Sequence, residues 1–201
     1  IITLSSKLSG TYQSACMAAS EASCPVRVVD SGQVTVSERI LVEYALGLAK
    51  EGLGAGEIAA RVEAVRERVV VIGLLDTLEY LRRGGRISAA AGTFGEMLSI
   101  KPVITIENGE VKMLGRARGS KNGRNLLNQQ IKASRGIDFS MPLALGYAGL
   151  SDALLQKYIR DSRALWEEYP GDELPVYTVG ATIGTHVGPG AIALAYFERE
   201  Q

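Results

Sequence analysis

The sequence contains few of the residues from which metal sites and disulfide frameworks are built. Its 201 residues include two cysteines, Cys16 and Cys24, and a single histidine, His186. Two cysteines are too few for a disulfide framework, and in a reducing cytosol both would remain free thiols. One histidine and two separated cysteines also fall short of the ligand set of a zinc site. We therefore expect a cytoplasmic protein that holds neither a metal ion nor another cofactor.

An excess of charge of one sign and a long apolar run are absent as well. Lys and Arg together number 22, as do Asp and Glu, so the formal net charge is zero. Proteins that bind nucleic acids usually carry a basic excess. The longest apolar stretches fall well short of the roughly 20 residues that cross a bilayer, and no signal peptide is visible. We therefore expect no nucleic-acid partner and no stable membrane insertion.

Apolar strands alternate with amphipathic helices in the first third of the chain. The composition, 46% apolar and 22% charged, is that of a globular protein with a real core. The spacing of the apolar residues predicts strands at 1–5 and 26–30 and helices at 10–22, 37–50 and 57–67. Strands separated by helices form parallel βαβ units, and such sheets bind ligands beyond the carboxyl ends of their strands.

The remainder of the chain combines a hairpin with further βα units. Val69–Leu75 is an apolar run that predicts a strand buried on both faces. Asp76 and Glu79 form a capping-box pattern before a short helix that ends at Gly84-Gly85, and Asn108-Gly109 predicts a tight hairpin. The further elements predicted are strands at 102–107, 111–118, 142–148, 174–179 and 191–197, helices at 88–98, 120–134 and from the N-cap Ser151 through Trp166, and a glycine-rich loop at 180–190.

These elements predict an α/β fold of two α/β domains that are divided near residue 68. Residues 1–68 would be the remainder of the first domain, with a parallel sheet. Residues 69–201 would form the second, with a mixed sheet and helices. Because the sequence starts inside an apolar strand and without Met, we expect an N-terminal part of the first domain to precede residue 1.

The loop Ser5–Thr11 follows the first strand and leads into a helix. The unpaired amides of a helix's first turn and the helix dipole favour an anion at such a point. The hydroxyls of Ser5, Ser6 and Thr11 could add further donors, and the loop has no Asp or Glu that would repel the anion. An ordinary helix N-terminus without a ligand fits the same pattern.

His186 lies within Gly184–Gly190, where glycines allow the backbone to approach a ligand. Its imidazole could bind an anion or water, or it could be a loop histidine with structural contacts alone. A catalytic pair with Ser5 or Ser6 is conceivable, but the sequence has no Gly-x-Ser-x-Gly elbow and no acidic partner can be named. A hydrolase is therefore disfavoured. An enzyme that holds a small phosphorylated or carboxylated substrate at the Ser5–Thr11 loop remains an alternative.

Five arginines fall into two groups after residue 80. Arg82, Arg83 and Arg86 cluster at the end of the predicted short helix, and Arg116 and Arg118 share one face of a strand. Such clusters are usually solvated charge or helix-end pairing, but they also dock acidic or phosphorylated groups. The residues alone leave both interpretations open.

Several of these segments together resemble the landmarks of the DegV family. In the family's order, and across nearly the whole chain, they are Ile2–Ala15, Val29–Ser31, Leu78–Ile87, Ile100–Pro102 and Gly184–Gly190. The resemblance implies two α/β domains with a long-chain fatty acid held between them. It also implies a lipid-binding protein that is the non-catalytic component of a bacterial fatty-acid kinase. Such a protein presents the carboxyl group to a separate ATP-using subunit, which forms an acyl phosphate.

The resemblance also implies where the carboxylate is held. In the family pattern it is held by the serine that matches Ser6 and by a threonine from an upstream segment, which has no counterpart here. We expect Ser6 to bind the carboxylate most directly, with Ser5 and Thr11 completing the cradle. The histidine that matches His186 lies nearby and would add a hydrogen bond.

An acyl chain needs an apolar tunnel, and two segments could form its walls. They are the strand end Leu74–Leu75 and the segment Ala89–Met97, where small residues alternate with Phe94 and Met97. Simple core packing would explain the second segment equally well. The five arginines are candidates for contact with the kinase subunit. A structural adaptor without any ligand is the remaining alternative.

Overall fold

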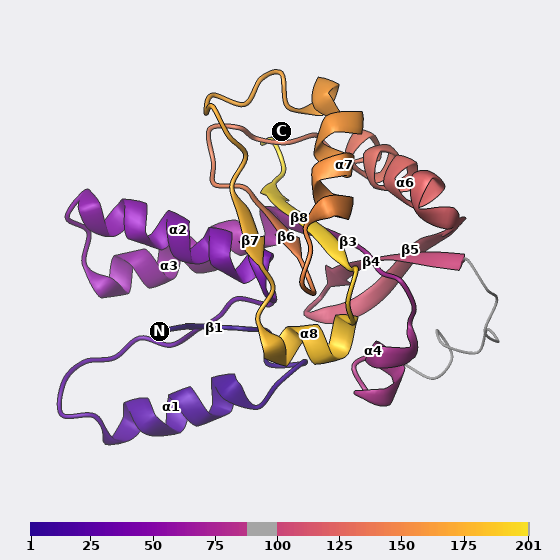
Figure 1. The fold of residues 1–201 in the computed structure, drawn as a ribbon. Coiled ribbons are helices and arrows are strands. Elements are labelled where there is room, and N and C mark those ends of the chain that lie inside the picture. The colour runs from indigo at the N-terminus through magenta and orange to yellow at the C-terminus, as the bar shows by residue number, and fades with distance from the viewer. Residues whose placement is uncertain (88–99, 201) are drawn as a thin grey trace.

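The computed structural model describes residues 1–87 and 100–200, which form two sheets flanked by helices (Figure 1). The small sheet pairs β1 (Ile2–Thr3) with β2 (Val29–Asp30) in parallel. The larger sheet has six strands in the order β5-β4-β3-β8-β6-β7, and all its neighbours are antiparallel except β6 and β7. Its strands are β3 (Val69–Leu74), β4 (Ile100–Glu107), β5 (Glu110–Arg118), β6 (Ala144–Tyr147), β7 (Val176–Thr178) and β8 (Ile192–Phe197). The predicted α/β fold with a small parallel and a larger mixed sheet is confirmed.

Helices cover both faces of the larger sheet. Helix α2 (Val36–Lys50) packs against β3, β6 and β8, and α3 (Ala55–Val65) packs on α2. The opposite face carries α6 (Gly119–Ala133) and α7 (Ala153–Asp161), as Figure 1 shows. The remaining helices are α1 (Thr11–Glu21), α4 (Glu79–Arg83), α8 (Ala181–Val187) and the short 3-10 turns η1 (Arg66–Arg68) and η2 (Arg163–Leu165).

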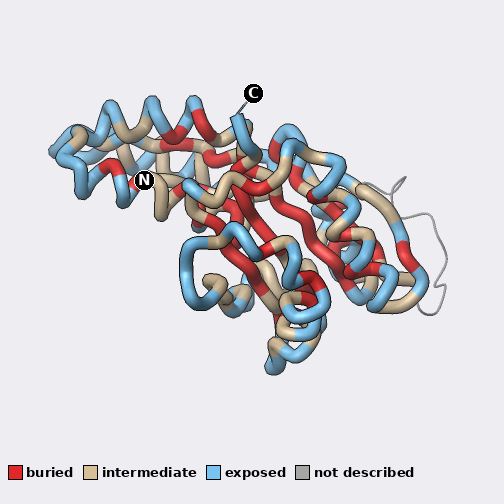
Figure 2. Tube along the Cα trace, turned by 90° about the horizontal axis from the view of Figure 1, so that it is seen from above, coloured by how far each residue is buried: buried red, intermediate tan, exposed pale blue. Residues whose placement is uncertain are grey.

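Strand β3 is buried on both faces because its side chains alternate between two cores. Val69 and Val71 pack with residues of α2 and α3, whereas Ile72 and Leu74 pack with residues of α6 and α7. Figure 2 shows the buried trace running through the centre of the molecule. Each fully buried aliphatic side chain contributes about 1.5–3 kcal/mol. The first core joins residues on both sides of position 68, and the domain boundary near that residue stays a prediction.

The turn between β4 and β5 is the predicted hairpin. Glu107 pairs with Glu110, and the two residues between them, Asn108 and Gly109, have φ of 51° and 79°. Positive φ at both positions defines the type I′ turn that joins twisted antiparallel strands. The Asn-Gly prediction is therefore confirmed.

The structure corrects the predicted start of α4. Asp76 does not cap this helix, because its carboxylate pairs with the Lys101 ammonium group instead. The side chain of Thr77 takes the local role, with its hydroxyl accepting a hydrogen bond from the Glu79 amide at 3.1 Å. The predicted end of the helix at Gly84 is confirmed.

The structure also corrects α7, which is shorter than its apolar pattern indicates. It begins at Ala153 and ends at Asp161, and the chain continues through η2 to the buried Trp166. Ser151 lies one residue before the N-cap, where its hydroxyl accepts a hydrogen bond from the Ala153 amide. Apolar spacing predicts which residues are buried, and the 3-10 turn preserves that burial beyond the helix.

A helix occupies the segment for which the sequence predicts a glycine-rich loop. Helix α8 has seven residues, among them Gly184 and the β-branched Thr182, Ile183 and Thr185. These residue types are weak helix formers, so propensity does not indicate a helix here. Short helices depend on tertiary packing, and α8 packs against α4. The predicted helix 88–98 and the predicted tunnel segment Ala89–Met97 lie outside the described residues.

Candidate functional site

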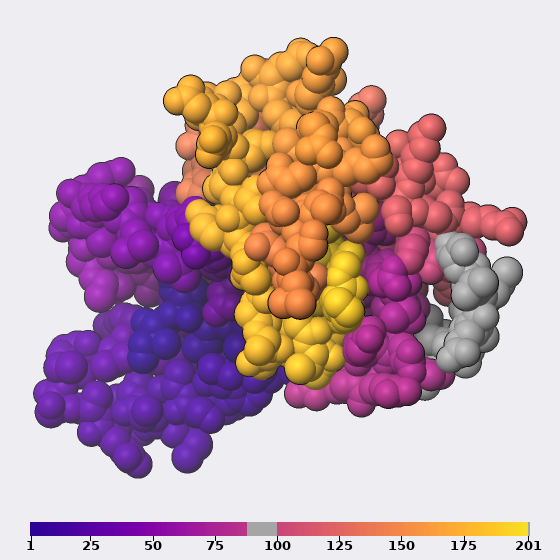
Figure 3. All heavy atoms as spheres, viewed as in Figure 1, coloured from indigo at the N-terminus to yellow at the C-terminus, as the bar shows by residue number. Residues whose placement is uncertain are grey.

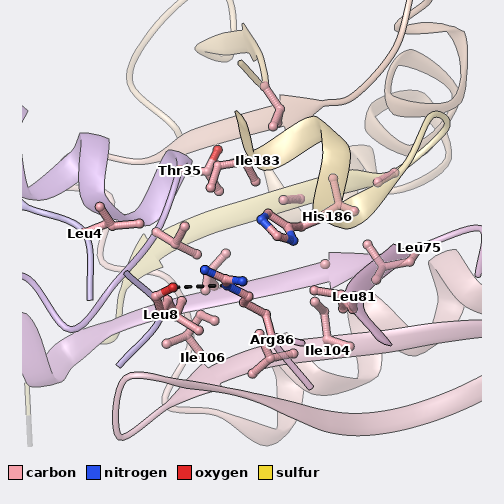
Figure 4. A pocket seen from close by; sticks show the side chains of 18 of the residues that line it. Leu4, Leu8, Thr35, Leu75, Leu81, Arg86, Ile104, Ile106, Ile183 and His186 are labelled. Carbon is pink, nitrogen blue, oxygen red and sulfur yellow. Dashed lines mark hydrogen bonds between the residues drawn. The ribbon is translucent and has the colours of Figure 1, made fainter. Parts of the chain in front are cut away.

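An apolar cavity of about 150 Å³ lies where the end of β1, the larger sheet, α4 and α8 meet (Figure 4). Most of its lining side chains are aliphatic, among them Leu4, Leu8, Leu75, Leu81, Ile104 and Ile183. Of the predicted tunnel residues, Leu75 lines this cavity, whereas Leu74 points to the core beneath α6 and approaches Gly123. In Figure 3 the atoms of α4 and α8 form adjoining parts of the surface. The aliphatic lining of this cavity suits a hydrocarbon chain.

Few polar side chains reach this cavity, and one of them is a cation. Arg86 donates from Nε to the Leu8 carbonyl oxygen at 3.2 Å and from Nη1 to the Gly84 carbonyl oxygen at 2.6 Å. These bonds use only two of the donors of the guanidinium group. Figure 4 shows the Arg86 and His186 side chains entering the cavity from α4's end and from α8. The cavity thus combines apolar walls with a cation and an imidazole.

His186 is held where two short helices touch. Its imidazole lies so close to Gly84 that a methyl group on that glycine would collide with it. Gly188 plays a matching part, because its φ is 75° and a Cβ there would collide with the ring of Tyr80. The glycines around both motifs therefore allow α4 and α8 to pack closely. His186 lies on a helix, so its predicted place in a loop is wrong, while its contact with the carboxylate stays a prediction.

Ser5 has a role that the sequence did not indicate. Its side chain is 1% exposed, and its hydroxyl donates to the Gly109 carbonyl oxygen at 2.7 Å while accepting from the Lys7 amide at 3.2 Å. The hydroxyl proton is therefore already used, and Ser5 fastens the loop to the β4–β5 turn. A role for Ser5 in the carboxylate cradle stays a prediction, and it would require this hydroxyl to turn away from the Gly109 carbonyl oxygen.

Ser6 lies on the other side of the loop, beside a carboxylate. Its amide donates to Asp30 Oδ1 at 3.1 Å, as does the Gly32 amide at 2.9 Å. Burial alone would raise the pKa of Asp30, but hydrogen bonds from Ser6 and Gly32, with Arg66 nearby, together lower it. Ser6 lines a polar cleft of about 580 Å³ that it shares with Asp30 and Arg66. An anion at Ser6 would therefore approach an ionised carboxylate.

Among the hydroxyl residues of the loop, Ser9 lines the apolar cavity, whereas Ser6 and Thr11 do not. Its hydroxyl is within 2.9 Å of the exposed Thr11 hydroxyl and accepts from the Thr11 amide at 3.3 Å. The sequence signal for Ser9 was present, since it belongs to the same hydroxyl-rich loop. The carboxylate roles of Ser6 and Thr11 stay predictions.

The structure separates the five arginines into two kinds. Arg82 and Arg83 are exposed on α4, and Arg83 pairs with Glu79. Arg116 and Arg118 are exposed on one face of β5. Arg86 differs from all four because it lines the cavity. Contact of these residues with a partner protein stays a prediction.

Within residues 1–87 and 100–200, no helix combines the length and the apolar character that a bilayer crossing requires. The same residues contain no group of His, Cys, Asp and Glu side chains that could hold a metal ion.

Comparison with known proteins relates the whole chain to one family. The model of the DegV family, described as uncharacterised protein, DegV family, matches residues 1–199. A DegV domain-containing protein of Streptomyces coelicolor is 35% identical over 202 residues, which cover 98% of this chain and 68% of that protein.

Solved structures of the same family share the fold. A fatty-acid-binding DegV family protein from Thermus thermophilus superposes with a TM-score of 0.82 at 32% identity, covering 98% of this chain and 69% of that one. Protein TM841 from Thermotoga maritima, whose structure reveals a fatty-acid-binding function, gives a TM-score of 0.81 at 26% identity. That match covers 98% of this chain and 68% of TM841.

Proposed function

This chain belongs to the DegV family, as its motifs indicated, and we propose that it binds a long-chain fatty acid without transforming it. The alkyl chain lies in the apolar cavity between β1, the larger sheet, α4 and α8. The carboxylate lies at the edge of that cavity, where Arg86, His186 and Ser9 come from three different segments. The observation that carries this proposal is an apolar cavity with a cation at its edge.

The hydrophobic effect supplies the larger part of the affinity. Each methylene group that leaves water contributes about 0.8 kcal/mol. Ten buried methylenes would therefore contribute about 8 kcal/mol before the loss of motional freedom is subtracted. Aliphatic walls such as Leu81 and Ile104 offer no polar group that would have to be desolvated. A long chain is accordingly favoured over a short one.

The polar groups at the cavity edge fix the orientation of the ligand. A buried carboxylate is unfavourable unless several donors satisfy it. The Arg86 guanidinium group supplies charge and N–H donors, and His186 and Ser9 supply further hydrogen bonds. Ser6 is proposed to complete the site from the side of the polar cleft that it lines. Thr11 is proposed to act through Ser9, because their hydroxyl oxygens lie 2.9 Å apart.

We further propose that this chain is the lipid-binding component of a bacterial fatty-acid kinase. A separate ATP-dependent subunit would transfer the phosphoryl group to the carboxylate in the cytoplasm. The exposed side chains of Arg82 and Arg83 on α4, beside the carboxylate site, support a docking surface for that subunit. Arg116 and Arg118 would extend it along β5. This chain itself would supply no catalytic residue and no cofactor.

Lipid extraction and direct binding test the proposal. Mass spectrometry of the purified full chain should detect a co-purified C16–C18 acid, and the delipidated chain should bind such an acid but not its short-chain analogues. Turnover of a small phosphorylated or carboxylated substrate without bound lipid would favour an enzyme, and no ligand at all would favour a structural adaptor.

A pair of variants on α8 separates a specific site from general lipid adsorption. Ile183 lines the cavity and Thr185, two residues further on, is exposed and does not. Ile183→Asn should weaken fatty-acid binding strongly, because it places an amide against the alkyl chain, whereas Thr185→Asn should bind like the wild type. Equal fatty-acid affinity of both variants would show that the acyl chain does not lie in this cavity.

A further inference from the structure

The imidazole of His186 lies against a glycine of the neighbouring helix. A methyl group on Gly84 would collide with Nδ1, and it would lie 2.6 Å from Cε1 and 3.2 Å from the Tyr80 carbonyl oxygen. The backbone of Gly84 has φ of −75° and ψ of −7°, values that any residue adopts. Glycine is therefore required at this position for the space that it leaves and not for its conformational freedom.

This contact bears on which ring nitrogen carries the proton. Nδ1 of His186 is buried and has no hydrogen-bond partner within residues 1–87 and 100–200. In glycine a hydrogen atom takes the direction of the missing Cβ, so the Cα–H bond of Gly84 points toward Nδ1. A proton on Nδ1 would meet that hydrogen head-on, whereas a lone pair on Nδ1 accepts it as a weak hydrogen bond. Buried N–H groups without an acceptor are also rare.

A second glycine fixes the same two helices. The φ of Gly188 is 75°, and a Cβ there would collide with the ring of Tyr80 on α4. Tyr80 thus rests on the end of α8 while His186 rests on the end of α4. The two close approaches therefore hold the ends of α4 and α8 against each other.

We propose that Gly84 is a positioning residue that keeps the proton of His186 on Nε2. The inference rests on the proposed function, in which the imidazole faces the carboxylate beside Arg86. With Nδ1 turned to Gly84, the neutral ring presents Nε2–H to the ligand. His186 then acts as a fixed hydrogen-bond donor to the carboxylate, and it neither removes a proton from the ligand nor adds a second cation to Arg86.

Nitrogen-15 NMR of the ligand-free full chain tests the tautomer directly. His186 is the only histidine, so its two ring nitrogens are observed without competing signals. In mildly alkaline buffer, where imidazoles are neutral, the wild type should show a protonated Nε2 and an unprotonated Nδ1. A protonated Nδ1, or an even mixture of the two tautomers, would overturn the proposal.

Two alanine variants separate positioning from a general effect on folding. Gly84→Ala should move the ring-nitrogen signals toward a mixture of tautomers, because the ring must leave its place. Gly184→Ala is the matched control, since a Cβ there meets nothing within 4 Å, and it should leave the signals unchanged. Unchanged signals in Gly84→Ala would count against the positioning role. Should Gly84→Ala not fold, the wild-type spectrum still decides the tautomer.

Affinity measurements then connect the tautomer with the ligand. His186→Gln places an amide nitrogen near the position of Nε2, and His186→Asn places one near Nδ1. We expect the Asn variant to bind a C16 acid about tenfold more weakly than the Gln variant. Equal affinities would contradict the proposal. A wild type that binds no fatty acid would refute the proposed function. The ligand-free spectrum would still show which ring nitrogen of His186 carries the proton.

Discussion

Arg86→Gln removes the cation at the cavity edge and keeps a side chain that can still donate hydrogen bonds. In the structure the guanidinium group is anchored to the Leu8 and Gly84 carbonyl oxygens, which leaves its remaining donors for a ligand. The substitution therefore tests the charge more than the shape of the site. We expect it to weaken the binding of a long-chain fatty acid.

The size of the effect follows from the surroundings of Arg86. Two unit charges about 4 Å apart attract by roughly 1 kcal/mol in water and by roughly 4 kcal/mol near a protein surface. Arg86 is exposed on one side and borders an apolar cavity on the other. An intermediate value of about 2 kcal/mol is therefore expected, which agrees with hydrogen bonds to charged groups and corresponds to about 30-fold in affinity.

The assay compares two ligands that differ only in charge. A C16 acid and its methyl ester place the same alkyl chain in the cavity, so isothermal titration or fluorescence displacement separates the contribution of the head group. Arg86→Gln should lower the affinity for the acid about 30-fold and should change the affinity for the ester little. Added salt should reduce the difference for the wild type, because it screens exposed charges.

Arg83→Gln provides the matched control. Arg83 lies on α4, is exposed and pairs with Glu79, but it does not line the cavity. Its variant should bind the acid like the wild type. Two results would show that the carboxylate does not lie beside Arg86. One is wild-type affinity of Arg86→Gln for the acid, and the other is an equal loss of affinity for the acid and for the ester.

Three further substitutions test the packing and electrostatics of the fold. Gly123→Ala should lower the free energy of unfolding by about 1–3 kcal/mol in a denaturant titration, because the new methyl group would lie 2.6 Å from Leu74 Cδ1. An unchanged denaturation midpoint would contradict this, because it would show that Leu74 can move aside without loss of stability. Gly109→Ala should also destabilise the protein by about 1–3 kcal/mol, because φ is 79° and the methyl group would lie 2.7 Å from the Ser5 hydroxyl oxygen; wild-type thermal stability would contradict the turn. Burial raises the pKa of Glu38 to about 7, so the folded state binds more protons than the unfolded state between about pH 4.3 and 7, and stability falls as the pH rises through that window. Glu38→Gln should therefore stabilise the protein by about 1–2 kcal/mol at pH 8 and by little at pH 4, and a gain independent of pH would refute this.

Local backbone chemistry explains the predictions that the structure confirms. The turn at Asn108-Gly109 requires positive φ at two successive residues, and this dipeptide is among the few that accept it. The apolar run Val69–Leu75 predicts a strand covered on both faces, and β3 alternates between two cores. In both cases the relevant preference belongs to a few neighbouring residues, so it can be seen without the rest of the fold.

Elements that depend on distant contacts could not be predicted in the same way. Helix α8 forms from weak helix formers because it packs on α4, about a hundred residues earlier in the chain. Trp166 continues the apolar pattern of α7, although the helix ends at Asp161. Periodicity indicates which side chains are buried, and tertiary packing decides the backbone that buries them.

For this protein, the amino-acid sequence alone determined the class of fold, the hydroxyl-rich loop after β1, the Asn-Gly turn and the motifs of its family. The tertiary structure decided which of those side chains face the cavity. It turned the Ser5 hydroxyl to Gly109, placed Ser6 beside Asp30, and brought Arg86 to the cavity edge. The physical reason is that hydrogen-bonding capacity is a property of a residue, whereas the partner that uses it is supplied by segments up to a hundred residues away.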